Sequence, residues 1–222
     1  MSKETRDDLE ESTTPDARRF FVNDVDAVFD RLVREEADLD NVKRALWRFM
    51  RVGYESRRFS TARAYLEKIL SLEGDSEQRA VCFLLLGGSY ERERDYVCAA
   101  EAYSRAFTLP VQANETWYFL QNNLGYSLNQ TGHQDQAEAH CRAAIAIDPT
   151  RHNAYKNLGV ALEGLGRPVE AALSFIKAAL AFPRDSRALR HLEDLLSRHP
   201  EVGRNHSEIA AGLRECREAA RL

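Results

Sequence analysis

Residues 155–183 read YKNLGVALEGLGRPVEAALSFIKAALAFP, and residues 121–149 read QNNLGYSLNQTGHQDQAEAHCRAAIAIDP. The same residues return in both stretches after 34 positions: Leu-Gly at 124–125 and 158–159, alanine at 137 and 171, alanine at 144 and 178, and proline at 149 and 183. Four matches at one spacing are improbable by chance. A repeat of this length indicates supersecondary units that stack on their neighbours.

Each stretch has the hydrophobic period of a pair of helices. Tyr155, Leu158 and Leu162 are three and four residues apart, so they share one face of a helix. Glycines then interrupt the pattern, and Pro168 suits the first turn of a new helix. The second helix ends at Pro183. The small residues Gly, Ala and Ala mark places where a larger side chain would overpack a helix contact, at a cost of ~1–3 kcal/mol.

This pattern of aromatic, Leu-Gly, Ala, Phe and Pro resembles the tetratricopeptide repeat (TPR), which has the same period. Residues 155–183 match it closely, whereas the preceding stretch departs at Gln121 and Cys141, where aromatic residues are usual. The resemblance implies an all-α fold. We expect a right-handed α-α superhelix (a TPR solenoid) of about four helix-turn-helix repeats with N- and C-terminal capping helices.

Two earlier units carry weaker forms of the pattern. One has Leu86-Gly87 followed by Ala99 and Tyr103, and the first has no Leu-Gly pair although hydrophobic residues keep the spacing. Terminal repeats are often atypical because they cap the stack. We therefore divide the chain into a disordered tail (1–18), an N-terminal capping helix (19–40), a degenerate first repeat (41–75), further repeats at 76–113, 114–151 and 152–185, and C-terminal capping helices (186–222).

The two ends of the predicted stack carry apolar faces, at Val28–Val33 and at Ile209–Leu213. Asn205 and Glu208 have the spacing of a capping box before the last helix. Repeat stacks with incomplete caps can continue into a second copy. A homo-oligomer joined through these end helices is therefore one alternative.

Composition excludes several classes of function. The net charge of −4 argues against nucleic-acid binding, which needs a surplus of Lys and Arg. No run approaches the ~20 consecutive apolar residues of a membrane-spanning helix, and the polar start has no secretory or lipidation signal. The four cysteines are widely spaced and form no CxxC pair. We expect a cytoplasmic protein with no membrane contact.

The TPR resemblance also implies where a partner binds, since the first helix of each unit lines the concave face in that family. The peptide-binding groove is expected at positions flanking the Leu-Gly pairs and on the helix that follows the last repeat: Phe119, Asn122, Asn123, Tyr126, Asn129, Asn153, Lys156, Asn157, Arg187, Arg190 and His191.

Asn123 and Asn157 occupy the same place in consecutive repeats. A side-chain amide both donates and accepts, so it can hold a peptide backbone without reading its sequence. The alternative is that each asparagine satisfies a neighbouring helix. The two-carboxylate clamp of some TPR proteins is not predicted, because Asn122, Tyr126 and His191 replace three of its five residues.

No catalytic or cofactor motif is found. Gly164 and Gly166 lie in a turn between helices and follow no strand, and His133, His140 and Cys141 do not make a metal site, which needs three or four convergent ligands. The expected function is a protein–protein interaction module or scaffold that binds an extended peptide or partner protein and is not an enzyme. The alternatives are a small chaperone or assembly factor for a secretion or envelope complex, and a self-assembling scaffold.

Overall fold

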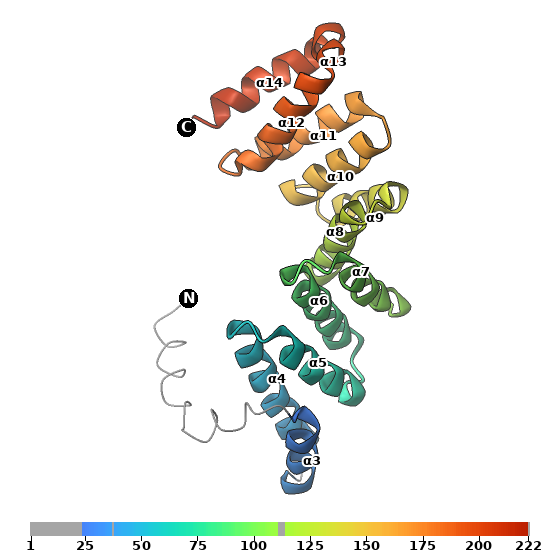
Figure 1. Cartoon of the computed structure of the whole chain (residues 1–222), viewed down its shortest axis with the longest axis vertical. Helices are drawn as coiled ribbons and strands as arrows, with labels where there is room; N and C mark the ends of the chain where they lie inside the picture. The colour runs from blue at the N-terminus through green and yellow to red at the C-terminus, as the bar shows by residue number, and fades with distance from the viewer. Residues whose placement is uncertain (1–23, 37, 111–113, 222) are drawn as a thin grey trace. The chain divides into compact units, whose positions relative to one another are not determined.

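The computed structural model describes residues 24–36, 38–110 and 114–221, and the elements within these ranges are all helical (Figure 1). The tail predicted at 1–18 lies outside the described residues. The chain divides into two compact units, the first ending at Glu73 and the second beginning at Gly74. The all-α TPR solenoid expected from the sequence is confirmed.

The first unit contains α3 (Val25–Glu35), α4 (Leu39–Glu55) and α5 (Phe59–Leu72). Helix α4 begins at an aspartate cap, because the side chain of Asp38 accepts a hydrogen bond from the Asp40 backbone N–H. Helices α4 and α5 pack as a pair around Leu46, Leu66 and Ile69, which are fully buried. Helix α3 contacts both helices but buries none of its own residues completely.

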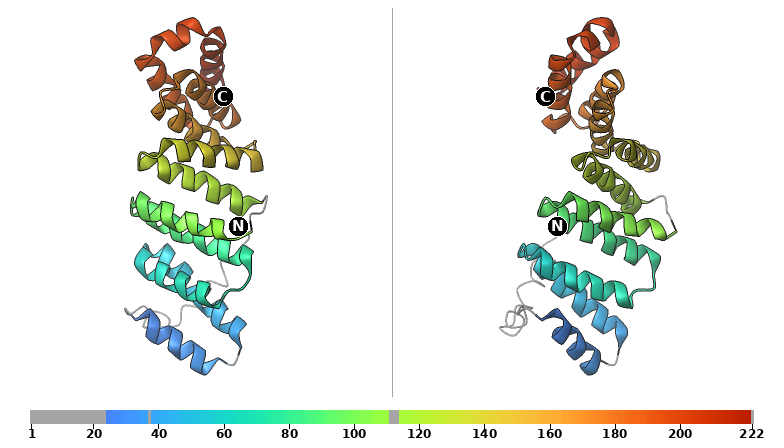
Figure 2. Two further views of the ribbon diagram at one scale, coloured as in Figure 1. Left: turned by 90° about the vertical axis from the view of Figure 1, so that its right-hand side faces the viewer. Right: turned by 45° about the vertical axis from the view of Figure 1, so that its right-hand side comes forward.

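The second unit continues the same pairing through its length (Figure 2). Its helices are α6 (Ser76–Arg92), α7 (Tyr96–Arg105), the short 3₁₀ helix η1 (Ala106–Thr108), α8 (Glu115–Gln130), α9 (Gln134–Ile147), α10 (His152–Gly164), α11 (Pro168–Ala181), α12 (Ser186–Arg198), α13 (Pro200–Asn205) and α14 (Ser207–Ala219). Helices α6, α8, α10 and α12 contact one another in sequence and form a first-helix layer. Helices α7, α9 and α11 lie beside them as the second layer.

The glycine of each Leu-Gly pair lies directly under a side chain of the partner helix, which is an aromatic ring in two of the three pairs. A Cβ added to Gly87 would lie 2.3 Å from the Tyr103 ring, and one added to Gly159 would lie 2.4 Å from the Phe175 ring. Atoms this close overlap, so glycine is required there. At Gly125 the facing residue is Cys141, whose sulfur would lie 2.7 Å from the added Cβ. The buried thiol therefore occupies the place of the usual aromatic ring.

All four helix pairs turn at an equivalent residue with positive φ. It is a glycine in two pairs, Gly132 (φ 83°) and Gly166 (φ 70°), and an arginine in the other two, Arg57 (φ 59°) and Arg94 (φ 63°). Five residues after each of these lies a fully buried alanine: Ala62, Ala99, Ala137 and Ala171. The first pair therefore follows the repeat geometry although it has no Leu-Gly pair.

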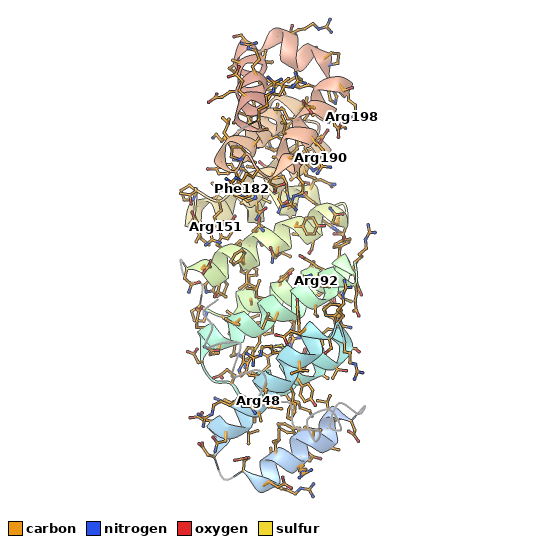
Figure 3. The ribbon with its side chains drawn as sticks, turned by 90° about the vertical axis from the view of Figure 1, so that its left-hand side faces the viewer. Arg48, Arg92, Arg151, Phe182, Arg190 and Arg198 are labelled. Atoms are coloured by element: carbon orange, nitrogen blue, oxygen red, sulfur yellow. The ribbon has the colours of Figure 1, made fainter. Side chains whose placement is uncertain are left out.

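The loop between α11 and α12 leaves an aromatic ring at the surface. Phe182 is 46% exposed and stacks on His152 at a centroid distance of 4.9 Å (Figure 3). This loop sets the start of α12, where the Asp185 side chain accepts from the Arg187 backbone N–H.

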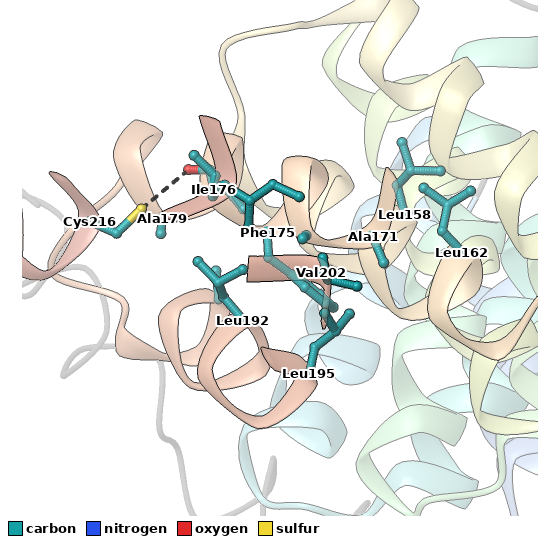
Figure 4. Close-up of a cluster of buried hydrophobic side chains, with 14 of the residues drawn as sticks. Leu158, Leu162, Ala171, Phe175, Ile176, Ala179, Leu192, Leu195, Val202 and Cys216 are labelled. Atoms are coloured by element: carbon teal, nitrogen blue, oxygen red, sulfur yellow. Dashed lines mark hydrogen bonds between the residues drawn. The ribbon is translucent and has the colours of Figure 1, made fainter. Parts of the chain in front are cut away.

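The C-terminal helices cover the end of the second unit. Ile209 and Cys216 of α14 are buried against α11, and the Cys216 thiol lies 3.8 Å from the Ile176 carbonyl oxygen (Figure 4). Because Ile209 is fully buried, the Ile209–Leu213 face packs within the chain. The capping box predicted from Asn205 and Glu208 is wrong, since α14 starts after His206 and no side chain caps it.

No helix in the described ranges has the length and hydrophobicity needed to cross a membrane.

Candidate functional site

The predicted groove residues lie on three neighbouring helices of the first-helix layer. Helix α8 carries Phe119, Asn122, Asn123, Tyr126 and Asn129, helix α10 carries Asn153, Lys156 and Asn157, and helix α12 carries Arg187, Arg190 and His191. We call the side of these helices that carries Asn123, Tyr126, Asn153, Arg187, Arg190 and His191, which are all partly or fully exposed, the groove face.

Three of the predicted asparagines join α8 to α10 and do not face solvent. The Asn157 side-chain amide donates to the Asn122 side-chain oxygen at 3.1 Å and to the Asn122 carbonyl at 3.4 Å. The Asn129 amide donates to the Asn157 carbonyl at 2.8 Å. All three are at most 9% exposed. Asn157 therefore has the structural role that was the alternative to ligand binding, since its side chain hydrogen-bonds to the neighbouring helix.

In every repeat of the second unit, the residue at the Asn129 position makes a polar tie, by which we mean a hydrogen bond or ion pair to the next helix of the first-helix layer. Its equivalents are Glu91, which accepts from the Ser127 hydroxyl at 3.1 Å, and Glu163, whose carboxylate lies 2.5 Å from the Arg198 guanidinium. Each side chain reaches the next helix of the first-helix layer. Burial raises the pKa of Glu91, which also receives a hydrogen bond from Tyr103. This row of ties fixes the spacing of the helices beneath the groove face.

Asn123 differs from Asn157 although the two are equivalent in the repeat. It is half-buried, and its side-chain oxygen accepts from the Asn122 amide at 2.9 Å. Within the described part of the chain, no group accepts a hydrogen bond from its own amide nitrogen. Asn123 therefore keeps two donor hydrogens for a ligand.

Two aromatic residues of α8 belong to the predicted groove. The Tyr126 ring meets the Tyr96 ring edge-on at 5.7 Å, and burial followed by the interaction with Tyr96 raises its pKa to about 12. Phe119 is instead packed against Tyr118 and covered by the Arg151 guanidinium, 4.9 Å from its ring centre.

The α12 end of the groove face is cationic. The Arg187 guanidinium donates three hydrogen bonds to Asp185, of 2.7, 2.8 and 3.0 Å, and this pairing holds the pKa of the Asp185 carboxyl far below its usual range. Arg190 is exposed beside it (Figure 3). Arg187, Arg190, His191 and Asp194 line a small pocket of about 260 Å³.

The second layer carries a different surface. A larger hollow of about 400 Å³ lies between α9 and α11 over α10, lined largely by apolar side chains. Above it, Arg167 bridges Glu138 and Glu170 at 2.7 Å each, which ties α9 to α11. Glu138 also binds Arg142, and the hydrogen bonds from both arginines lower its pKa despite the opposing effect of burial.

Gln121, which stands where the repeat usually has an aromatic residue, has a partner on the neighbouring helix. The Gln121 side-chain oxygen lies 2.7 Å from His140 Nδ1, joining α8 to α9. Burial lowers the pKa of His140, which favours the neutral ring. Because the Gln121 oxygen can only accept, this contact requires the proton on Nδ1. Among the described side chains, no three of the metal-ligating types converge. His133, the other histidine considered for metal binding, is exposed at the start of α9.

Comparison with known proteins was made for sequence families and for solved structures. A family model described as tetratricopeptide repeat matches residues 120–151. A search of curated protein sequences gave no match.

Several solved structures share the fold. The crystal structure of MamA protein has a TM-score of 0.64 at 17% identity, covering 80% of this chain and 91% of that one. MamA 41-end from Desulfovibrio magneticus RS-1 has a TM-score of 0.65 at 19% identity, covering 81% and 95%. The second TPR domain of human RPAP3, solved in complex with an HSP70 peptide, has a TM-score of 0.50 at 25% identity, covering 55% and 98%. These findings confirm the resemblance to tetratricopeptide-repeat proteins.

Proposed function

Since the chain has the tetratricopeptide-repeat fold and carries a matched repeat at 120–151, we propose that it is a binding module without catalytic activity. It holds an extended segment of another protein against the groove face of α8, α10 and α12. The repeat divisions 41–75, 76–113, 114–151 and 152–185 belong to the same proposal.

The observation that carries this proposal is the unused hydrogen-bonding capacity of the groove face. Asn123 keeps its donor hydrogens, and Asn153 of the next helix makes no side-chain hydrogen bond with the described residues. The buried asparagines and glutamates beneath them hold the helices in register, so these two amides have fixed positions. A peptide backbone offers the matching carbonyl and N–H groups.

The comparison with RPAP3 supports the binding of a peptide. A TPR domain of that protein binds a peptide from HSP70, and its structure covers 55% of this chain at 25% identity. A cytoplasmic location is part of the proposal, because all four cysteines are free thiols, as is usual in reducing compartments. A chaperone or assembly factor would use the same face.

The test is a pull-down with two matched variants of the full chain. One bait carries Asn123→Ala and Asn153→Ala on the groove face. The control bait carries Gln136→Ala and Lys177→Ala, which are exposed on α9 and α11 of the second layer. A partner kept by the control bait and lost by the groove bait supports the proposal. A partner lost by the control bait alone places binding on the second layer and contradicts it.

A further inference from the structure

The hollow of about 400 Å³ between α9 and α11 leaves apolar surface in contact with water. Both helices pack on α10 but barely contact each other. The most buried residues that line the hollow are Leu158 and Leu162 of α10, which lie at one side of the buried cluster in Figure 4. Leu173 of α11 lines it as well and is 38% exposed. A partner that covers this surface gains the free energy of removing it from water.

The equivalent space between α7 and α9 is filled by the chain's own side chains. The rings of Phe107 and His140 lie there with 5.5 Å between their centres, and Gln121 holds His140 with a hydrogen bond of 2.7 Å. Counted from the Leu-Gly pair of each repeat, the residues equivalent to Phe107 and His140 are Ile145 and Ser174, which both line the hollow. Because an isoleucine and a serine replace two rings, the space between α9 and α11 stays open.

The charges beside the hollow leave one cation over. Glu138 and Glu170 both bind Arg167, and Arg142 adds a second guanidinium to Glu138, so two carboxylates and two guanidiniums balance. Lys177 lines the hollow from α11, is exposed, and forms no salt bridge with the described residues. The hollow therefore combines an apolar lining with one surplus positive charge, which an acidic residue of a partner would match.

A helix suits this surface better than an extended segment. The hollow is formed by helices, whose backbone groups are already hydrogen-bonded, so an extended peptide finds few backbone partners there, whereas a helix satisfies its own backbone. A different side of α11 is already covered in this way by α14, which buries Ile209, Gly212 and Cys216. These residues are three and four positions apart and share one face of α14. A second amphipathic helix can use the same spacing on the α9 side.

We propose that the hollow between α9 and α11 is a second docking site, and that its occupant is an acidic amphipathic helix of a partner protein. Apolar side chains three or four residues apart enter the hollow, and an aspartate or glutamate beside them pairs with Lys177. The inference goes beyond the proposed function, because the hollow belongs to the second layer and no residue of the groove face lines it.

The test is a selection on the full chain from a phage library of alanine-based helical peptides with one randomised face. A filled variant, Ile145→Phe with Ser174→His, copies the side chains that occupy the space between α7 and α9. The selected peptides are expected to carry large apolar residues three or four apart beside an acidic residue, and to bind the filled variant at least about tenfold more weakly, because the rings exclude them. A selection that yields no peptide preferring the native chain would overturn the proposal.

Two further variants keep the test decisive if the filled variant does not fold. Leu173→Ala truncates an exposed side chain of the hollow and is expected to weaken the selected peptides about fivefold. Lys177→Glu is expected to weaken them by a similar factor, and replacing the acidic residue of the peptide with lysine is expected to restore binding. The matched control is Arg214→Glu, an exposed residue of α14 outside the hollow. Equal affinities for native chain, Leu173→Ala and Lys177→Glu would refute the site.

Other occupants and the groove face are separated by two measurements. The Asn123→Ala, Asn153→Ala variant is expected to bind the selected peptides as the native chain does, and a loss there would show that the peptides bind the groove face instead. If light scattering finds a dimer of the native chain that the filled variant does not form, the occupant is a second copy and the proposed partner is wrong. Neutralising Lys177 alone, as in the control bait, is expected to weaken the helix only about threefold.

Discussion

At the scale of single residues, equivalent positions in the repeat do different work. Asn157 is 4% exposed, and its side-chain amide donates a hydrogen bond to Asn122. Asn123 is half-buried, and its side-chain amide donates no hydrogen bond to the described residues. The sequence predicted both asparagines as groove residues because the repeat makes them equivalent. It could not separate them, since the contact that buries Asn157 comes from the neighbouring helix and has no local signal.

This difference predicts opposite results for the same substitution. Asn157→Ala removes the donor to Asn122, which leaves a buried oxygen with one partner fewer, so it is expected to lower the free energy of unfolding by about 1–3 kcal/mol. Asn123→Ala is expected to change it by less than about 0.5 kcal/mol, since that side chain is partly solvated. Urea unfolding of the two variants measures both values. Equal losses would mean that Asn123 is also a structural tie.

At the scale of helix pairs, the repeating glycine positions allowed most helices of the second unit to be predicted, because a larger side chain would not fit there. Gly87, Gly125 and Gly159 each lie under a side chain of the partner helix, so their spacing reports the fold directly. The turns were harder to predict. Two of the four use arginine at positive φ, Arg57 and Arg94, and arginine carries no turn signal.

Arg94 is therefore a site where stability can be gained. A non-glycine residue at a φ of 63° has a backbone strained by about 1–2 kcal/mol, and glycine at this position removes the strain. Glycine also makes the unfolded chain more flexible, which offsets part of the gain. Arg94→Gly is expected to raise the free energy of unfolding by about 0.5–1 kcal/mol. The matched control is Arg92→Gly, two residues earlier at the end of α6, where glycine loses helix propensity and stability falls. A lower urea midpoint for Arg94→Gly would show that its side chain has a stabilising contact.

At the scale of the whole molecule, the two compact units differ in their titratable groups. All six histidines lie in the second unit, between residues 133 and 206. Burial is the largest cause that lowers the pKa of three of them, His140, His152 and His191. As pH falls, the unfolded chain therefore binds protons at these sites before the folded chain does. Their contribution to stability is present above the unfolded pKa of 6.5 and is lost below it.

The two tryptophans allow each unit to be followed separately. Trp47 lies in the first unit and Trp117 in the second, so Trp47→Phe and Trp117→Phe each leave one reporter. Between about pH 7.5 and 5.5, where histidines titrate and carboxylates of ordinary pKa do not, the urea midpoint reported by Trp117 is expected to fall. The midpoint reported by Trp47 is expected to stay constant, since residues 1–73 contain no histidine. If both midpoints fall together, the two units unfold as one cooperative structure, and a constant Trp117 midpoint would mean that the buried histidines are protonated equally in both states.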